Sequence, residues 1–195
     1  MTAIFFGGDF LKKKVSLFLA VVFCMFFVLS SCGDPINALE NFCFKIKDFD
    51  LEAAYAYVDD GADGYFERAL GYEQKLSERQ LEIAKELYSY VGFTDITETD
   101  GVYSVTVKYI DFSALINDVN ISLAMGMGNA SDHISDIISS GRLKTQFIRT
   151  EKNVPVVITE IDGEAKLVLG YSSENKRFTE LLGLEAFLGW YSTKR

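Results

Sequence analysis

The sequence predicts an α+β domain in which N-terminal helices pack on a curved antiparallel sheet and a helical insertion precedes a C-terminal hairpin. Apolar residues recur at helical spacing in the first half of the chain, strand-like alternation begins near residue 93, and the two patterns do not alternate as βαβ units require. The length of 195 residues fits one domain with a short additional segment. We assign residues 1–31 to that segment and residues 32–195 to the domain.

The predicted helices begin at capping residues. Asp34 followed by Pro35 fits an N-cap and the first helical position, and Asp50 can cap a second, shorter helix. Residues 77–80 have the spacing of a capping box, which predicts the start of a third helix. Between the second and third helices, residues 59–64 are rich in Asp and Gly and predict a turn.

Strand patterns dominate the second half of the domain. Residues 102–112 alternate from one side of a strand to the other. Residues 93–98 predict a short strand before them, and a turn at residues 99–101 separates the two. Residues 154–161 and 164–169 are joined by Asp162-Gly163, a strong hairpin signal. These four segments predict the sheet.

A helical insertion interrupts the strands. Residues 113–125 and 131–150 carry apolar side chains at helical spacing, so the insertion covers about residues 113–150. A last helical segment closes the chain near Trp190.

The first 31 residues have the organisation of an export signal. Lys12, Lys13 and Lys14 precede the uncharged run 15–29, after which small polar residues lead to Cys32. The run has fifteen residues, whereas a spanning helix needs about 20. Export followed by cleavage is therefore favoured over the alternative of an uncleaved anchor.

Leu29-Ser30-Ser31-Cys32 resembles the lipobox of bacterial lipoprotein precursors. The resemblance implies that Cys32 is linked by a thioether to diacylglycerol, that cleavage occurs before it, and that it becomes the mature N-terminus. We expect at least two acyl chains, such as palmitate, which suffice for stable anchoring. Cys32 is thus the predicted lipid-attachment site of a protein anchored in the cell membrane, with its domain on the extracytoplasmic face.

The charge of the remaining chain restricts its partners. Without residues 1–31 the chain keeps sixteen basic and twenty-seven acidic residues, a formal charge of −11. Such a chain repels phosphates and anionic lipid, so we expect no nucleic-acid partner and a membrane attachment that depends on the lipid. The other cysteine of the domain, Cys43, has apolar neighbours and is predicted to be a small buried hydrophobe rather than a nucleophile.

The order of elements is similar to that of small bacterial lipoproteins with a nuclear transport factor 2-like (cystatin-like) fold. The segment NALENFCFKIKDFDLEAAYAYV follows the lipid cysteine, and VPVVITEIDGEAKLVL lies near the end. The resemblance implies a cone that encloses a pocket, used by different members for ligand binding, for catalysis or for neither. Two departures are the length of the insertion and Lys166-Leu167-Val168 in the last strand, where such domains often carry Trp.

The single histidine is the first candidate for chemistry. His133 lies between Asp132 and Asp136, which could form a metal site or a general base. Zinc requires three or four protein ligands, and no other histidine or suitable cluster is in register. We predict instead a helix start, with Ser131 as its cap and an exposed imidazole.

Asp59, Asp60 and Asp63 with their glycines suggest a calcium loop. The pattern fails at the third position, which is Gly61, and at the twelfth, which is Leu70 instead of Glu. We predict an acidic turn between helices, and weak millimolar calcium binding stays open as the alternative.

Two further patterns do not indicate a functional site. Gly126-Met127-Gly128-Asn129 lacks the third glycine of a dinucleotide fingerprint and is predicted to be a hinge between helices. Tyr103, Tyr109 and Tyr171 could line a pocket or pack in the core. We therefore predict no catalytic, cofactor-binding or metal-binding residues.

Three functions remain compatible with the sequence. The first is a non-catalytic, membrane-tethered domain that binds a small molecule, a peptide or an envelope protein. The second is a nuclear transport factor 2-like enzyme of the isomerase or hydratase type, and the third is a purely structural lipoprotein. An open apolar pocket favours the first, a buried carboxylate beside a tyrosine in a pocket the second, and a packed interior the third.

Overall fold

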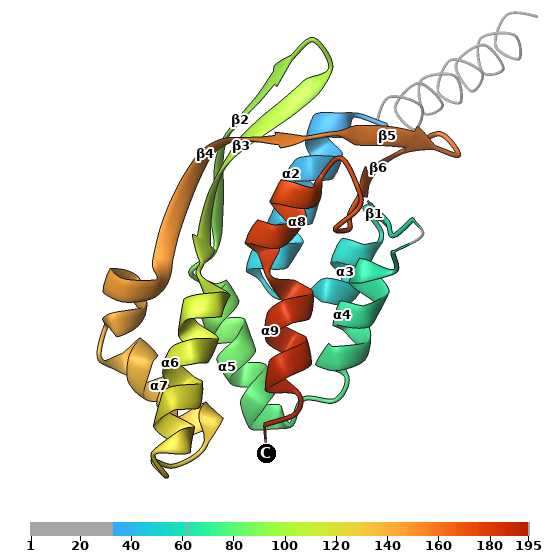
Figure 1. Ribbon diagram of the computed structural model, residues 1–195. Helices are drawn as coiled ribbons and strands as arrows, with labels where there is room; N and C mark the ends of the chain where they lie inside the picture. Colours follow the sequence, from blue (N-terminus) through green and yellow to red (C-terminus); the bar gives the residue numbers. More distant parts are fainter. Residues whose placement is uncertain (1–32, 62, 195) are drawn as a thin grey trace, which may run out of the picture.

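The computed structural model describes residues 33–61 and 63–194 (Figure 1). Along the chain the elements are α2 (Pro35–Lys47), α3 (Leu51–Tyr55), β1 (Val58–Asp59), α4 (Tyr65–Glu73), α5 (Glu78–Tyr88), β2 (Gly92–Thr99), β3 (Val102–Ile110), α6 (Phe112–Ala124), α7 (Ala130–Ser139), the π-helical turn η1 (Leu143–Phe147), β4 (Ile148–Val156), β5 (Ile158–Ile161), β6 (Glu164–Val168), α8 (Lys176–Leu182) and α9 (Leu184–Tyr191). The predicted α+β class is confirmed.

Local capping starts three of the helices where the sequence predicts. The side chain of Asp34 accepts a hydrogen bond from the N–H of Ile36 at the start of α2, and Asp50 caps α3. Ser77 and Gln80 form the reciprocal bonds of a capping box on α5. These ends depend on residues adjacent in sequence, which is why the sequence predicts them.

The strands form two three-stranded sheets. One has the order β2-β3-β4 and is antiparallel throughout. The other has the order β1-β6-β5, in which β1 pairs with β6 in parallel and β5 and β6 form a hairpin around the predicted turn. The predicted extent of the first hairpin strand, residues 154–161, was wrong, because residues 154–156 belong to β4 and pair with β3. Val157 is the residue between β4 and β5, so one continuous segment passes from the first sheet to the second (Figure 1).

The insertion is shorter than predicted. Helices α6 and α7 are present, but residues 148–150, expected to be helical, are the first residues of β4. Ile148 pairs with Ile110 and Thr150 with Lys108 on β3. Ladder hydrogen bonds to β3 thus override the local helical spacing.

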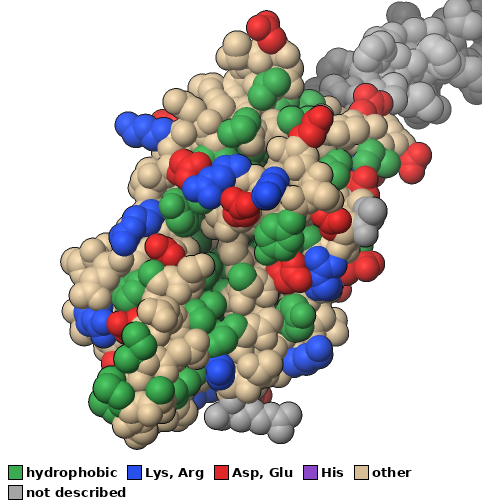
Figure 2. Space-filling view, in the orientation of Figure 1, with side chains coloured by type: hydrophobic (Ala, Val, Ile, Leu, Met, Phe, Trp, Pro, Cys, Tyr) green, Lys and Arg blue, Asp and Glu red, His purple; other side chains and the backbone are tan. Residues whose placement is uncertain are grey.

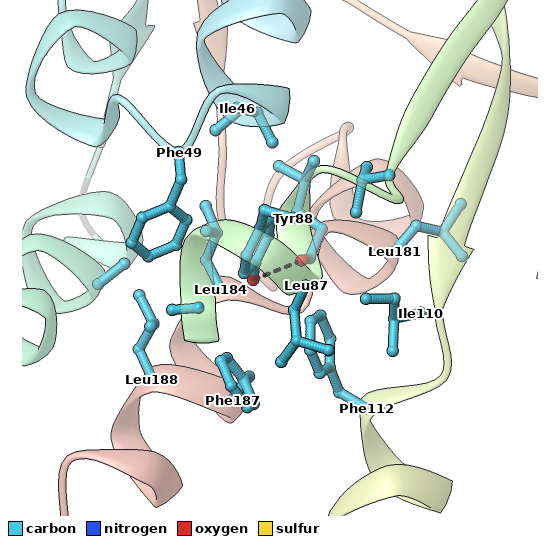
Figure 3. Close-up of a cluster of buried hydrophobic side chains, with 14 of the residues drawn as sticks. Ile46, Phe49, Leu87, Tyr88, Ile110, Phe112, Leu181, Leu184, Phe187 and Leu188 are labelled. Atoms are coloured by element: carbon cyan, nitrogen blue, oxygen red, sulfur yellow. Dashed lines mark hydrogen bonds between the residues drawn. The ribbon is translucent and has the colours of Figure 1, made fainter. Parts of the chain in front are cut away.

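Helices cover the sheets and close a single hydrophobic cluster. Helix α2 packs against both β2 and β6, α8 against β3 and β4, and α4 against α9. Within the cluster the rings of Phe112 and Phe187 stack with centroids 4.6 Å apart, and the hydroxyl of Tyr88 donates to the carbonyl of Leu182 at 3.1 Å (Figure 3). Aromatic side chains thus join the aliphatic ones in the interior.

A glycine separates α8 from α9. Gly183 has a φ of +62°, and a Cβ added to it would lie 2.4 Å from the ring of Phe112. Only glycine avoids both the left-handed strain and this clash. The break directs the apolar faces of both helices into the cluster of Figure 3.

Candidate functional site

The predicted lipid-attachment site, Cys32, lies outside the described residues, as does the rest of the predicted signal. The description begins at Gly33, and α2 starts at Pro35. Folded structure therefore begins within three residues of the predicted attachment site. None of the helices between residues 33 and 194 has the length and apolar character needed to cross a bilayer.

Cys43 has the predicted position. Its side chain lies on the buried face of α2 with 4% exposure. Burial raises the pKa of the Cys43 thiol well above its ordinary value. A buried, protonated thiol packs as a small hydrophobe and is a poor nucleophile.

The acidic turn before α4 does not gather its carboxylates into one site. Asp60 is buried, and its two oxygens accept the N–H groups of Phe66 and Glu67, each at 2.6 Å. Asp59 accepts from the N–H of Gly61 at 3.2 Å, on its own side of the turn.

Asp63 turns toward another part of the chain. It accepts from the backbone N–H of Ser172 at 2.9 Å and from its hydroxyl, and these hydrogen bonds lower the pKa of Asp63. Across the described residues no three His, Cys, Asp or Glu side chains approach closely enough to hold a metal ion. The role of this turn is therefore to cap α4 through Asp60.

The buried phenols of Tyr65 and Tyr88 hydrogen-bond backbone carbonyls rather than a carboxylate. Tyr65 donates to the carbonyl of Thr179 and Tyr88 to that of Leu182, and burial raises the pKa of both phenols. Asp60 is the buried acid among the described residues, and backbone amides occupy both of its oxygens. The carboxylate–tyrosine pair that an isomerase or hydratase would need is not assembled by these groups.

The structure decides between pocket lining and packing for the three tyrosines that the sequence left open. Tyr103 is buried on β3, whereas Tyr109 on the same strand is partly buried. Tyr171 is 42% exposed and packs edge-to-face on Tyr65 with centroids 5.5 Å apart. Their role is packing at separate places.

His133 lies in the first turns of α7, but the predicted cap was wrong. Asn129 caps the helix by accepting the N–H of Asp132, because the chain turns into the helix two residues earlier than expected. The hydroxyl of Ser131 instead hydrogen-bonds that of Tyr191. The imidazole of His133 contacts the backbone carbonyl of Met127, and the carboxylate of Asp132 pairs with Arg79.

A surface groove between α3, α4 and α5 has the features of a binding site. It has a volume of about 720 Å³. Its walls combine carboxylates with an apolar floor, and we call it the acidic groove; its lining residues are Asp48, Phe49, Asp50, Leu51, Glu52, Tyr55, Leu70, Glu73, Gln74, Leu76, Leu81 and Lys85. Phe49 and Leu51 are buried members of the hydrophobic cluster, and the other apolar lining residues pack against it.

The charges of the acidic groove are only partly balanced. Lys45 donates to Asp50 at 3.1 Å, and this hydrogen bond lowers the pKa of Asp50. Glu73 is half-buried, and desolvation raises its pKa; Lys85 opposes the shift, whereas Asp50 and Glu52 add to it. Burial disfavours the charged form of such a carboxylate, and a nearby cation stabilises that form.

The sequence did not predict this groove because its walls come from separate segments. One wall belongs to α4, a helix that has no adjacent capping signal: Gly64 precedes it, and Asp60 caps it from further upstream. The available signal was the acidic cluster 48–52 around the predicted helix cap.

Comparison of the chain with models of protein families, with curated proteins and with solved structures returns no match.

Proposed function

We propose that the protein is a lipid-anchored, non-catalytic binding domain on the extracytoplasmic face of the cell membrane. The observation that carries the proposal is the order of three lysines, a fifteen-residue apolar run and Leu29-Ser30-Ser31-Cys32. The start of α2 at Pro35 supports it, because so short a connection keeps the domain next to the bilayer.

The charge of the domain also supports a covalent anchor. A formal charge of −11 after residue 31 opposes adsorption on anionic lipid. Two acyl chains contribute about 0.8 kcal/mol for each buried methylene and need no help from basic residues. The lipid on Cys32 is thus the proposed source of membrane affinity.

Metabolic labelling with an alkyne analogue of palmitate tests the anchor. We expect labelled protein from the wild type and none from Cys32→Ala. Cys43→Ala is the matched control and should keep the label, since that thiol is buried in the fold. Labelling of Cys32→Ala at the wild-type level would overturn the proposal.

We further propose that the acidic groove is the binding surface. The groove offers carboxylates beside apolar side chains, several of which belong to the hydrophobic cluster or pack against it. Such a surface fits a small molecule or an envelope-protein segment that has a cationic group beside an apolar body. Glu73 supplies the carboxylate that a cation would stabilise most.

Site-specific photocrosslinking in intact cells tests this surface. A photoreactive residue at Gln74, in the groove, should give a specific product that Glu73→Lys weakens at least about tenfold. The same replacement at Gln146, an exposed glutamine on η1, is the control and should not give it. Failure to obtain a product at Gln74 would contradict a binding groove and favour the purely structural alternative.

A further inference from the structure

The soft donor side chains of the domain are concentrated in one short segment. The sequence contains four methionines and one histidine, and Met1 and Met25 belong to the predicted signal. The other two methionines, Met125 and Met127, and His133 all lie within residues 125–133, which connect α6 to α7. The third kind of soft donor, the Cys43 thiol, is buried on α2 and separate from this segment.

The backbone of this connection is held at both ends while its methionines stay exposed. The N–H of Met127 donates to the carbonyl of Ser122 at 3.1 Å, which closes the end of α6, and Asn129 caps α7. The side chains of Met125 and Met127 are 63% and 47% exposed. Figure 2 shows hydrophobic side chains at the surface of the end of the molecule formed by α6 and α7.

The imidazole of His133 is oriented by this same loop. Its Nε2 contacts the backbone carbonyl of Met127, so Nε2 carries the proton when it donates to that oxygen. Nδ1 then holds the free lone pair. Histidines that bind metals commonly donate their other ring N–H to a backbone carbonyl or a carboxylate, which fixes the tautomer and the ring.

Two thioethers and one imidazole are ligands that favour a soft metal ion. Zinc and calcium favour thiolate, imidazole or oxygen ligands, and the loop lacks enough of them. Thioethers are soft ligands that select Cu(I), for which imidazole is also suitable. The negative charge of the domain further favours a cation.

We propose that the α6–α7 connection binds one soft monovalent metal ion of the Cu(I) class through the thioethers of Met125 and Met127 and the imidazole of His133. This assignment is independent of the lipid anchor and of the acidic groove. The sequence predicted no metal-binding residues, and this proposal departs from that prediction because it counts thioethers as ligands.

Ag(I) provides a probe of this site that does not change oxidation state. The whole protein is purified in detergent with ¹³C-labelled methionine methyl groups, and Ag(I) nitrate is added in chloride-free buffer. We expect the methyl resonances of Met125 and Met127 to shift together and to saturate at one equivalent. Met125→Leu and Met127→Leu assign the two methyl resonances, and any methyl resonance from Met1 or Met25 should not shift.

Competition with bathocuproine disulfonate under ascorbate measures the affinity for Cu(I). Met125→Leu, Met127→Leu and His133→Asn should each weaken binding at least about tenfold, whereas the buried-thiol control Cys43→Ala should leave it unchanged. Equal melting temperatures of the metal-free variants verify that these replacements preserve the fold. The proposal is overturned if Ag(I) gives no saturable shift, if the double methionine variant binds as the wild type does, or if binding is lost with Cys43.

Discussion

Asp60 is a buried carboxylate whose environment explains a helix that the sequence does not predict. Gly64 precedes α4 and has no side chain to cap it. The two oxygens of Asp60 accept the N–H groups of Phe66 and Glu67 instead. Unpaired N–H groups at a helix start favour negative charge, so the carboxylate is stabilised by the helix that it caps.

Replacement of this capping carboxylate should be destabilising. Asp60→Ala leaves two N–H groups without partners, one of them buried, and we expect the free energy of unfolding to fall by about 1–3 kcal/mol. Asp59→Ala is the matched control, because Asp59 accepts one exposed hydrogen bond from Gly61. Urea unfolding of both variants measures the difference, and equal losses would refute the capping role.

At the scale of elements, Asn175 connects the two sheets. It is 1% exposed and lies beside Val157, the residue between β4 and β5. Its side-chain oxygen accepts the N–H of Val157 at 2.7 Å, and its amide donates to the carbonyls of Val157 and Val168 at 2.7 and 3.2 Å. The side chain thus supplies the hydrogen bonds that a neighbouring strand would otherwise provide.

Loss of these bonds should weaken the junction between the sheets. Asn175→Ala leaves the polar groups of Val157 unpaired, and we expect a loss of at least about 2 kcal/mol in the free energy of unfolding. Asn120→Ala should stay within about 0.5 kcal/mol, because that exposed side chain accepts one hydrogen bond from Trp190. Chemical denaturation followed by near-ultraviolet circular dichroism distinguishes the two outcomes, and a similar loss in both variants would contradict the junction.

The separation along the chain between a side chain and its hydrogen-bond partners explains which elements the sequence predicts. Asp34 and Asp50 are adjacent to the helices that they cap, and Asp162-Gly163 is itself the turn of its hairpin, so local patterns suffice. Asp60 and Asn175 act across loops or between sheets, and no local pattern marks them. The candidate sites divide likewise: Cys32 and His133 stand out in the sequence, whereas the acidic groove depends on packing.

Across the whole molecule, several carboxylates prefer their ionised form when folded. A hydrogen bond from Arg177 lowers the pKa of Glu151, and Lys166 has the same effect on Glu164. The folded pKa values lie below the ordinary value of 4.5. Their stabilisation is therefore present above that pH and lost as the pH falls through the folded values.

We expect the free energy of unfolding to decrease as the pH falls from about 5 to about 3. Glu73 should act in the opposite direction, because burial raises its pKa and ionisation at neutral pH costs stability. Glu73→Gln should therefore stabilise the protein at pH 7, by less than about 1 kcal/mol because solvent screens a half-buried group. Melting temperatures across this pH range measure both effects; the gain should vanish near pH 3, and a variant less stable at neutral pH would disprove it.

The parallel pairing of β1 with β6 has a consequence for the order of folding. Val58 pairs with Leu167, so the first strand of the chain has no partner until the last hairpin is synthesised. The sheet cannot close while the ribosome is still producing the helices between them, and such distant pairing is slow to form. The chain should therefore stay incompletely folded until residues 164–168 have been synthesised, so that its first half waits for its last strand.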